Sequence, residues 1–235
     1  GSATLNNIYT KREVNKMNSV LNDFFKTQGK KRKQAFAERR LLIEVPKLEA
    51  HIFNQNLKTI IDAIDKDAFL TKAIYFNKAE GSNWSVANHQ DVAINVAKDK
   101  TSKKANKIWK EKTDGYYGWT EKEEVVSVCP PEEIGKNRFT IRIHLDDANE
   151  KNGALKVIYG SHNKVLSDAE ISTITENSIP QLCEVLSGGV QLMKPLVLHA
   201  SGKSKTDKKR RVIHLEFASL DLQKGLLWQE YAEIN

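Results

Sequence analysis

The sequence predicts a mainly β protein with flanking helices: a jelly roll, or double-stranded β-helix, with a helical N-terminal region. Two observations lead to this prediction. The first third of the chain shows helical periodicity, and the rest consists of short segments rich in Val, Ile, Tyr and Thr, separated by Gly, Asn and Pro turns. The number of these segments suits a jelly roll, whose two sheets enclose a cavity.

The N-terminal third should be a helical support region covering residues 1–67. Thr10 and Glu13 have capping-box spacing, and Val14, Met17 and Leu21 then recur at helical intervals. We therefore expect a helix over residues 11–27 and a second helical stretch near residues 57–64.

The remainder, residues 68–235, should form the β core of the same single domain, since 235 residues suit one sizeable core. A long insert at about 98–137 interrupts it and contains Trp109, Tyr116, Tyr117 and Trp119. Loops of this length are usually lids or binding loops, so we expect either a flap over the cavity or aromatic packing on the outside of the barrel. The expected strands lie near residues 69–77, 85–96, 138–146, 154–159, 182–185, 189–194, 196–199 and 210–219.

Composition and charge argue against several classes of function. The net charge of +7 comes mainly from runs at 30–33, 103–112 and 203–211, which lack regularly interleaved aromatic residues; we expect solvated surface and no nucleic-acid partner. Cys129 and Cys183 have no disulfide or zinc spacing and should be ordinary thiols. The longest apolar runs are too short to span a bilayer and no signal peptide is visible, so no membrane partner and a cytoplasmic location are expected. Gly1-Ser2 looks like the remainder of a cleaved tag.

A candidate metal site begins at His89-Gln90-Asp91. Alternation along a strand puts the first and third side chains on the same side, where an imidazole and a carboxylate can bind one cation. His199 closes the apolar run 196–198 and fits a third ligand from a distant strand. Two histidines and one carboxylate on one face are typical of non-haem Fe(II) oxygenases, although an HxD tripeptide alone arises often by chance.

An arginine pair strengthens this interpretation. Arg210 and Arg211 open the strand that follows His199, and a guanidinium there can bind the carboxylate of a cosubstrate beside the metal. Alternation favours Arg210, because Arg211 shares its face with the apolar residues of the strand. In the strand at 140–146, Thr140, Arg142 and His144 likewise form a polar face that we expect to line the inner cavity rather than to meet water.

Taken together, these segments resemble the phytanoyl-CoA dioxygenase family, and especially its small bacterial members. The resemblance covers about residues 70–220. The matching stretches are Ile74-Tyr-Phe-Asn-Lys78 with Asn83-Trp84, His89-Gln-Asp91, Arg142-Ile-His-Leu-Asp-Asp147 with Asn152-Gly153, Gly160-Ser-His162, Gln191-Leu-Met-Lys-Pro-Leu-Val-Leu-His-Ala-Ser201 and Arg210-Arg-Val-Ile-His-Leu-Glu-Phe217.

The resemblance implies a cupin-like fold, Fe(II) as the metal and 2-oxoglutarate as cosubstrate. It assigns His89, Asp91 and His199 as iron ligands and Arg210 as the partner of the far carboxylate of 2-oxoglutarate. It also implies three further contacts near the cosubstrate, at Arg142, Gln90 and Lys78. Two positions depart from the family pattern, Tyr159 before Gly-Ser-His and Asn88 before the HxD motif, and neither removes a ligand.

The other histidines have simpler interpretations. His162 should be a turn or packing residue, and His51 a surface residue of a helix. His144 and His214 could contact substrate, but satisfied interior histidines are an equal interpretation, so neither is assigned a catalytic role.

The activity implied by the resemblance is hydroxylation of a small molecule by dioxygen, with succinate and CO2 formed from 2-oxoglutarate. Asp91 leaves no ligand position for chloride, which favours hydroxylation over halogenation. The alternatives are a non-catalytic jelly-roll module that binds a metal or a small acid, and a zinc hydrolase, in which Arg210 would have no purpose. Nothing in the sequence resembles a coenzyme A motif or indicates an oligomeric state.

Overall fold

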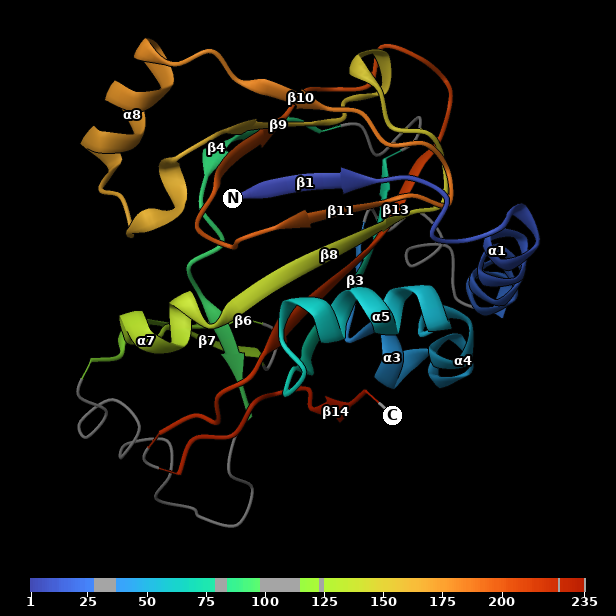
Figure 1. Cartoon of the computed structure of the whole chain (residues 1–235), viewed down its shortest axis with the longest axis horizontal. Coiled ribbons are helices and arrows are strands. Elements are labelled where there is room, and N and C mark those ends of the chain that lie inside the picture. Colours follow the sequence, from blue (N-terminus) through green and yellow to red (C-terminus); the bar gives the residue numbers. More distant parts are fainter. Residues whose placement is uncertain (28–36, 79–83, 98–114, 123–124, 224, 235) are drawn as a thin grey trace.

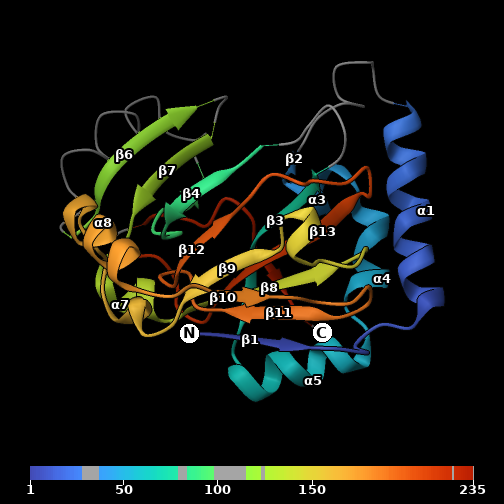
Figure 2. The same cartoon turned by 90° about the horizontal axis from the view of Figure 1, so that it is seen from above.

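The computed structural model describes residues 1–27, 37–78, 84–97, 115–122, 125–223 and 225–234, which form two main sheets and a third, smaller one (Figures 1 and 2). Among these residues the large sheet runs in the order β1 (Ser2–Leu5), β11 (Val190–Met193), β8 (Arg138–His144), β13 (Arg210–Ala218), β3 (Phe69–Lys78) and β14 (Ala232–Glu233), with β2 (Ala37–Arg39) also paired to β3. The small sheet runs β10 (Gln181–Cys183), β9 (Leu155–Ile158), β12 (Leu198–Ser201) and β4 (Val86–His89). Every pairing is antiparallel, as in a jelly roll.

The predicted N-terminal helices are confirmed, and they cover the outer face of the large sheet (Figure 1). Helix α1 (Lys11–Thr27) has the predicted bounds, and its capping box forms: the Glu13 amide donates to Thr10 Oγ1, and the Thr10 amide donates to the Glu13 carboxylate. Helix α5 (Gln55–Ile64) begins two residues earlier than expected, because Asn54 caps it by accepting from the Leu57 amide. The short helices α3 (Leu41–Glu44), η1 (Pro46–Leu48) and α4 (Glu49–Ile52) connect them.

Strand alternation sets the division between core and cavity. Ile141 and Ile143 of β8 pack with Ile213 and Leu215 of β13 against the N-terminal helices. The opposite faces of the same strands point toward the small sheet, where Thr140, Arg142 and His144 are buried. The predicted inward polar face is therefore enclosed by protein and does not meet water.

Two expectations about secondary structure need correction. The first third is not purely helical, because β1 and β2 belong to the large sheet. The strand expected at 85–96 is two strands, β4 and β5 (Ile94–Val96), separated by residues 90–93. The Asp91 amide there donates to the Pro195 carbonyl instead of continuing the ladder. We propose that residues 1–67 both support and extend the 68–235 core.

The insert at 98–137 contains ordered structure in its second half. Strands β6 (Tyr117–Lys122) and β7 (Val125–Cys129) join β5 in the three-stranded sheet, and α7 (Glu132–Lys136) follows. Tyr116 and Trp119 pack in a separate apolar cluster with Trp228. Within the described part of the insert no side chain lines the cavity, which matches the exterior-packing interpretation. Residues 98–114, with Trp109, lie outside the described residues, so the flap stays a prediction.

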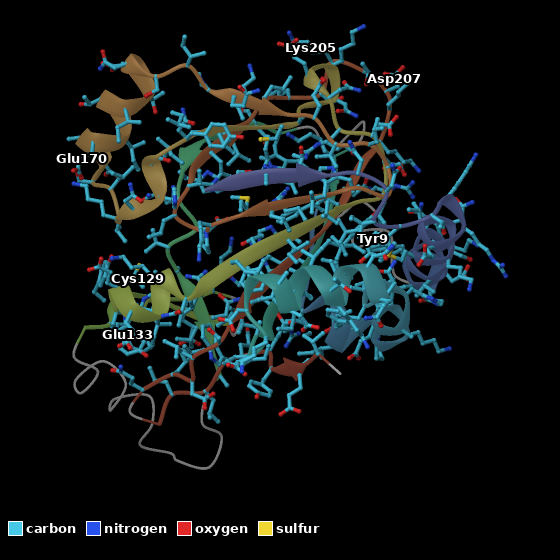
Figure 3. The ribbon with its side chains drawn as sticks, in the orientation of Figure 1. Tyr9, Cys129, Glu133, Glu170, Lys205 and Asp207 are labelled. Carbon is cyan, nitrogen blue, oxygen red and sulfur yellow. The ribbon has the colours of Figure 1, made fainter. Side chains whose placement is uncertain are left out.

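Between β8 and β13 the chain forms η2 (Glu150–Asn152), η3 (Ser161–Asn163) and α8 (Asp168–Asn177). The connection from β12 to β13 carries the basic run at 203–211, and its Lys205 and Asp207 lie exposed at the edge of the molecule (Figure 3), as expected for solvated surface. The runs at 30–33 and 103–112 both lie outside the described residues. Both cysteines are free thiols. Across the described ranges, no helix combines the length and the apolar character needed to cross a membrane.

Candidate active site

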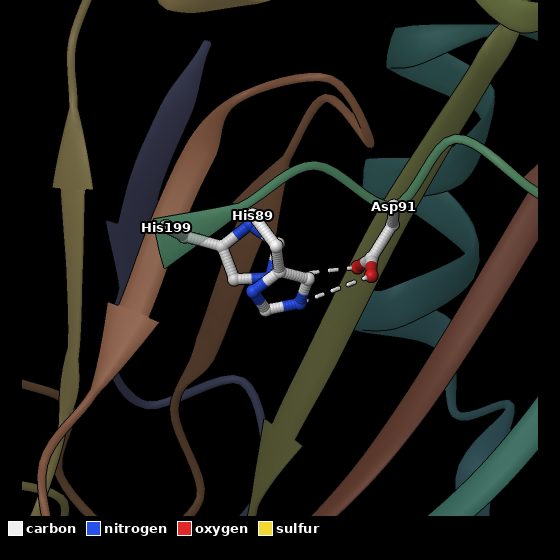
Figure 4. Close-up of side chains that lie close together, drawn as sticks. All are labelled: His89, Asp91 and His199. Atoms are coloured by element: carbon white, nitrogen blue, oxygen red, sulfur yellow. Dashed lines mark ion pairs between the residues drawn. The ribbon is translucent and has the colours of Figure 1, made fainter. Parts of the chain in front are cut away.

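Three side chains meet between the two sheets, as the sequence predicts (Figure 4). His89 ends β4 and lies directly opposite His199 of β12 in the antiparallel register, so their ring centroids are 4.2 Å apart. Asp91 follows in the break after β4, and its two carboxylate oxygens lie 3.5 Å from Nε2 of His89 and of His199. The candidate ligand atoms all lie within 4.8 Å of one another, which suits a single cation.

Backbone carbonyls orient both imidazoles. His89 Nδ1 lies 2.9 Å from the Ala87 carbonyl, and His199 Nδ1 lies 2.8 Å from the Val197 carbonyl. A carbonyl can only accept, so each Nδ1 carries a proton, and Nε2 of each imidazole, when neutral, is the nitrogen available to a metal. Outer-shell hydrogen bonds of this kind fix the tautomer of metal-binding histidines.

The local electrostatics leave the acid charged and one imidazole neutral. Burial by itself raises the pKa of Asp91, but the hydrogen bond from His89 and the nearby histidines outweigh it and the pKa is lowered. Burial lowers the pKa of His199 to about 4, partly opposed by Asp91. The hydrogen bond to Asp91 raises the pKa of His89, where a bound metal would compete with a proton.

The three candidate ligand side chains open into a cavity of about 270 Å³ between the sheets. Besides the three candidate ligands, its lining includes Arg39, Lys72, Ile74, Phe76, Trp84, Val86, Arg142, Leu155, Ser201, Arg210, His214 and Glu216. The large sheet therefore supplies most of the charged lining, facing the metal ligands on the small sheet.

Arg210 and Arg142 form a buried cationic end of this cavity. Arg210 is only 4% exposed, and burial with repulsion from Arg142 lowers its pKa to about 9. Burial likewise lowers the pKa of Arg142 to about 10, while the charge of Asp91 partly opposes this. Nε of each guanidinium is buried without a hydrogen-bond partner among the described residues. Two buried cations with free donors are suited to an anionic ligand.

Arg211 faces the other way, as strand parity predicts. Its guanidinium donates twice to the Asp146 carboxylate, at 2.8 Å from Nε and 2.7 Å from Nη2. Arg211 is absent from the cavity lining, so the structure distinguishes the two neighbouring arginines.

Two expected cosubstrate contacts lie outside the lining. The Gln90 amide donates to the carbonyls of Ser161, Lys164 and Leu196 and accepts from the Leu166 amide. Gln90 thus holds the 161–166 loop against the segment that leads into β12, and its cosubstrate contact stays a prediction.

Lys78 is the other. Fully buried, it donates to Ser201 Oγ and to the Gly202 carbonyl, and its ammonium lies over the Trp84 ring, 5.0 Å from the centroid. Burial and the charges of Arg210 and Arg142 lower its pKa to about 8. Lys78 therefore supports the lining residues Ser201 and Trp84 from behind.

Sequence reasoning missed a buried charge network around Glu216, which lines the same cavity. Glu216 accepts from Lys72 at 2.8 Å and from the fully buried Arg138 at 2.9 Å. Arg138 also donates to the Val92 carbonyl at 3.0 Å and, more weakly, to the Asp91 carbonyl at 3.5 Å, so it ties the segment that carries Asp91 to the large sheet. One feature of the sequence could have indicated this network, the alternation of side chains along the strand. Glu216 shares the inward face of β13 with Arg210, and Lys72 lies opposite Glu216 on β3.

The other four histidines lie either in the interior near the cavity or away from it. His214 lines the cavity and lies 2.9 Å from Arg142 Nη1 and 3.2 Å from Glu216 Oε1, so it is a bonded interior histidine. His144 is buried beside the arginines, which together with desolvation lower its pKa, and neither ring nitrogen has a partner among the described residues. His162 lies in η3 and His51 in α4, away from the cavity.

Comparison with known proteins identifies the class to which this fold and site belong. The sequence profile described as "Phytanoyl-CoA dioxygenase (PhyH)" matches residues 6–212. The chain therefore belongs to the phytanoyl-CoA dioxygenase family, which confirms the predicted family and its cofactor class, Fe(II) with 2-oxoglutarate. No protein with a curated description matches the sequence.

Solved structures confirm the fold. AviO1 from Streptomyces viridochromogenes Tue57 superposes with a TM-score of 0.65 at 16% identity, covering 93% of this chain and 89% of its own. EctD from S. alaskensis, solved with 2-oxoglutarate and 5-hydroxyectoine, gives 0.65 at 14% identity, covering 93% and 72%. SnoK, a non-heme alpha ketoglutarate dependent carbocyclase from nogalamycin biosynthesis, gives 0.65 at 11% identity, covering 94% and 80%.

The residues present fit both cofactors. Two imidazoles and one carboxylate are the donor set of a non-haem Fe(II) site. The partnerless Nε atoms of Arg210 and Arg142 are buried in the same cavity as these ligands. A dianion such as 2-oxoglutarate would satisfy such donors, which otherwise stay desolvated without compensation.

Proposed function

We propose that this protein is an Fe(II)- and 2-oxoglutarate-dependent dioxygenase that hydroxylates a small molecule. In the overall reaction, substrate, 2-oxoglutarate and dioxygen give hydroxylated substrate, succinate and CO2. The observation that supports this best is the placement of the His89, Asp91 and His199 side chains in one cavity with two buried arginines. The three candidate ligands alone, or the two arginines alone, would not distinguish an oxygenase from a simple metal-binding protein.

Each residue has a defined proposed role. His89, Asp91 and His199 would hold Fe(II), which when bound supplies dioxygen activation and hydrogen abstraction. Arg210 would bind the far carboxylate of 2-oxoglutarate at the closed end of the cavity. Arg142 would orient the cosubstrate, with its own guanidinium held by His214 and by the Phe76 ring, 5.8 Å from the centroid.

The protein also limits the chemistry. The ligand set of two histidines and Asp91 leaves no position for chloride, so hydroxylation is favoured over halogenation. Burial of His199 and Arg210 keeps water from the inner end of the site, which protects reactive chemistry from side reactions. The small cavity fits a metabolite better than an acyl-CoA. A cytoplasmic location and the lack of a nucleic-acid partner belong to the same proposal.

Two rivals remain in different classes, a non-catalytic binding module and a zinc hydrolase. The proposal is tested by anaerobic titration of the Fe(II) protein with 2-oxoglutarate, followed by aerobic incubation with a metabolite library. The oxygenase predicts 2-oxoglutarate binding that requires metal, and succinate formation that some library members stimulate. Metal-dependent binding with no succinate under any condition would favour the binding module.

A further inference from the structure

The lining of the cavity contains more positive charge than the two cofactors can neutralise. Four of its side chains are basic, Arg39, Lys72, Arg142 and Arg210, and two are acidic, Asp91 and Glu216. A divalent metal and the dianion of 2-oxoglutarate cancel each other. The cavity with both cofactors would therefore stay positive, and this favours a third component that is an anion.

The partners of the four cations show where that charge is free. Lys72 donates to Glu216, and Arg142 lies in hydrogen-bonding contact with His214. Within the described part of the chain, no hydrogen bond or ion pair engages the guanidinium of Arg39 or of Arg210. The cavity thus has two unengaged cations, and the proposed cosubstrate takes only Arg210.

Arg39 and Arg210 lie at different ends. Arg210 is buried and pairs with Lys78 of β3, whereas Arg39 pairs with Ile74, four residues away, and is exposed while still lining the cavity, which puts it at the mouth. Strand register also shows which side chains lie between Arg39 and Arg142 across the large sheet. Arg39 pairs with Ile74, Ile74 with His214, and His214 with Arg142, so the four side chains form a row across β2, β3, β13 and β8.

This row of side chains indicates how a substrate could lie in the cavity and how long it could be. Its Arg142 end lies in the same cavity as the candidate metal ligands His89, Asp91 and His199. Three steps between neighbouring strands separate the ends by roughly 14 Å between Cα atoms. Ile74 lies between them, and Phe76 lines the cavity on the same face of β3. A molecule anchored at the mouth would lie over this apolar surface with its far end toward the metal.

We propose that the primary substrate is a small carboxylic acid whose carboxylate is bound by Arg39 and whose apolar body lies on Ile74 and Phe76. This inference rests on the proposed oxygenase function and names the substrate class of that same site. Arg39 is then the residue that selects acids over neutral or cationic molecules of the same shape.

Three probes with one skeleton test the inference: 3-phenylpropionate, 3-phenylpropionamide and 3-phenylpropan-1-amine. Each is titrated by calorimetry into the Ni(II) protein with 2-oxoglutarate saturating, so that Arg210 is occupied. The acid should bind about tenfold more tightly than the amide or the amine, because only it forms a charge-assisted pair with the guanidinium.

Variants then assign the preference to Arg39. Arg39→Gln should lose about tenfold in affinity for the acid and leave the weaker amide and amine unchanged, and Arg39→Lys should recover part of the loss. The matched control is Arg40→Gln, which removes the same charge one residue away, where Arg40 pairs with Glu44 at 3.3 Å outside the lining. This control should bind the acid like the wild type.

The outcomes separate this inference from the proposed function. If 2-oxoglutarate binds but the three probes bind equally or none binds, or if Arg39→Gln keeps the preference for the acid, the substrate inference is overturned and the oxygenase proposal stands. If 2-oxoglutarate itself fails to bind the metal-loaded wild type, the proposed function is overturned, and the inference with it.

Discussion

Replacing Arg210 with methionine should weaken 2-oxoglutarate binding without destabilising the unliganded protein. Methionine keeps an unbranched apolar chain in the buried position and removes only the charged head. In the free protein that head lies beside Arg142, with its Nε unpartnered among the described residues. Its contribution is therefore realised only when the anion binds.

The structure gives a magnitude for each effect. Loss of one partner from a buried charged hydrogen bond costs about 2 to 5 kcal/mol. The affinity for 2-oxoglutarate should fall roughly 30- to 4000-fold. In the free protein, the pKa of Arg210 is about 9 rather than its ordinary 12.5. This difference corresponds to a cost on the order of 5 kcal/mol for keeping the guanidinium charged near neutral pH. Arg210→Met should therefore unfold at an equal or higher denaturant concentration.

Arg211→Met is the matched control with the opposite expectation. It removes the two-point contact with Asp146 and should lower the free energy of unfolding by about 1 to 3 kcal/mol. Its affinity for 2-oxoglutarate should stay at the wild-type value. Anaerobic titration and urea denaturation of both variants provide the assay. A variant Arg210→Met that binds normally, or an Arg211→Met that loses affinity, would show that the assignment by strand parity is wrong.

Three further predictions concern the metal, the buried network and pH. His199→Ala should weaken Fe(II) or Ni(II) binding by about 100-fold or more with folding retained, because losing a ligand should cost more affinity than losing an outer-shell group that orients it. Calorimetry measures the affinity, and His162→Ala is the control that should bind metal like the wild type. Equal affinity in the His199 variant would contradict the site. Arg138→Met should destabilise the fold by about 3 to 5 kcal/mol, since Glu216 stays buried with one cation fewer; an unfolding midpoint like that of the wild type would argue against the network. Burial raises the pKa of Glu230 from 4.5 to about 7, so the folded state retains a proton there and stability is lost as pH rises between these values. Glu230→Gln should match the wild type near pH 4.5 and be more stable by about 3 kcal/mol at pH 8, and a stability difference independent of pH would refute this.

Local patterns predicted much of the site because alternation along a strand is a local property. The spacing of His89 and Asp91 predicted two side chains that meet, and they do, although Asp91 lies just beyond the end of β4. The apolar face of β13 separated Arg210 from Arg211. The capping residues at 10 and 13 likewise fixed the start of α1. Each of these inferences depends on residues close together in the sequence.

The missed features depend on pairing between distant segments. Arg138 meets Glu216, and Arg39 reaches the cavity mouth through the β2–β3 register, and neither contact leaves a local pattern. Gln90 is a different case. The resemblance implies a cosubstrate contact for it, and the contacts that the structure adds, between its amide and the 161–166 loop, also join segments far apart in the sequence.

The most direct measurement of the central claim is the isotopic composition of succinate formed under ¹⁸O₂. Purified protein is reconstituted with Fe(II) and 2-oxoglutarate, exposed to ¹⁸O₂ with a stimulating acid, and analysed by mass spectrometry beside His199→Ala. We expect succinate carrying one ¹⁸O atom from the wild type, in amounts equal to the CO2 released, and only background from the variant. Succinate without ¹⁸O, or equal amounts from both proteins, would contradict an iron-dependent oxygenase at this site.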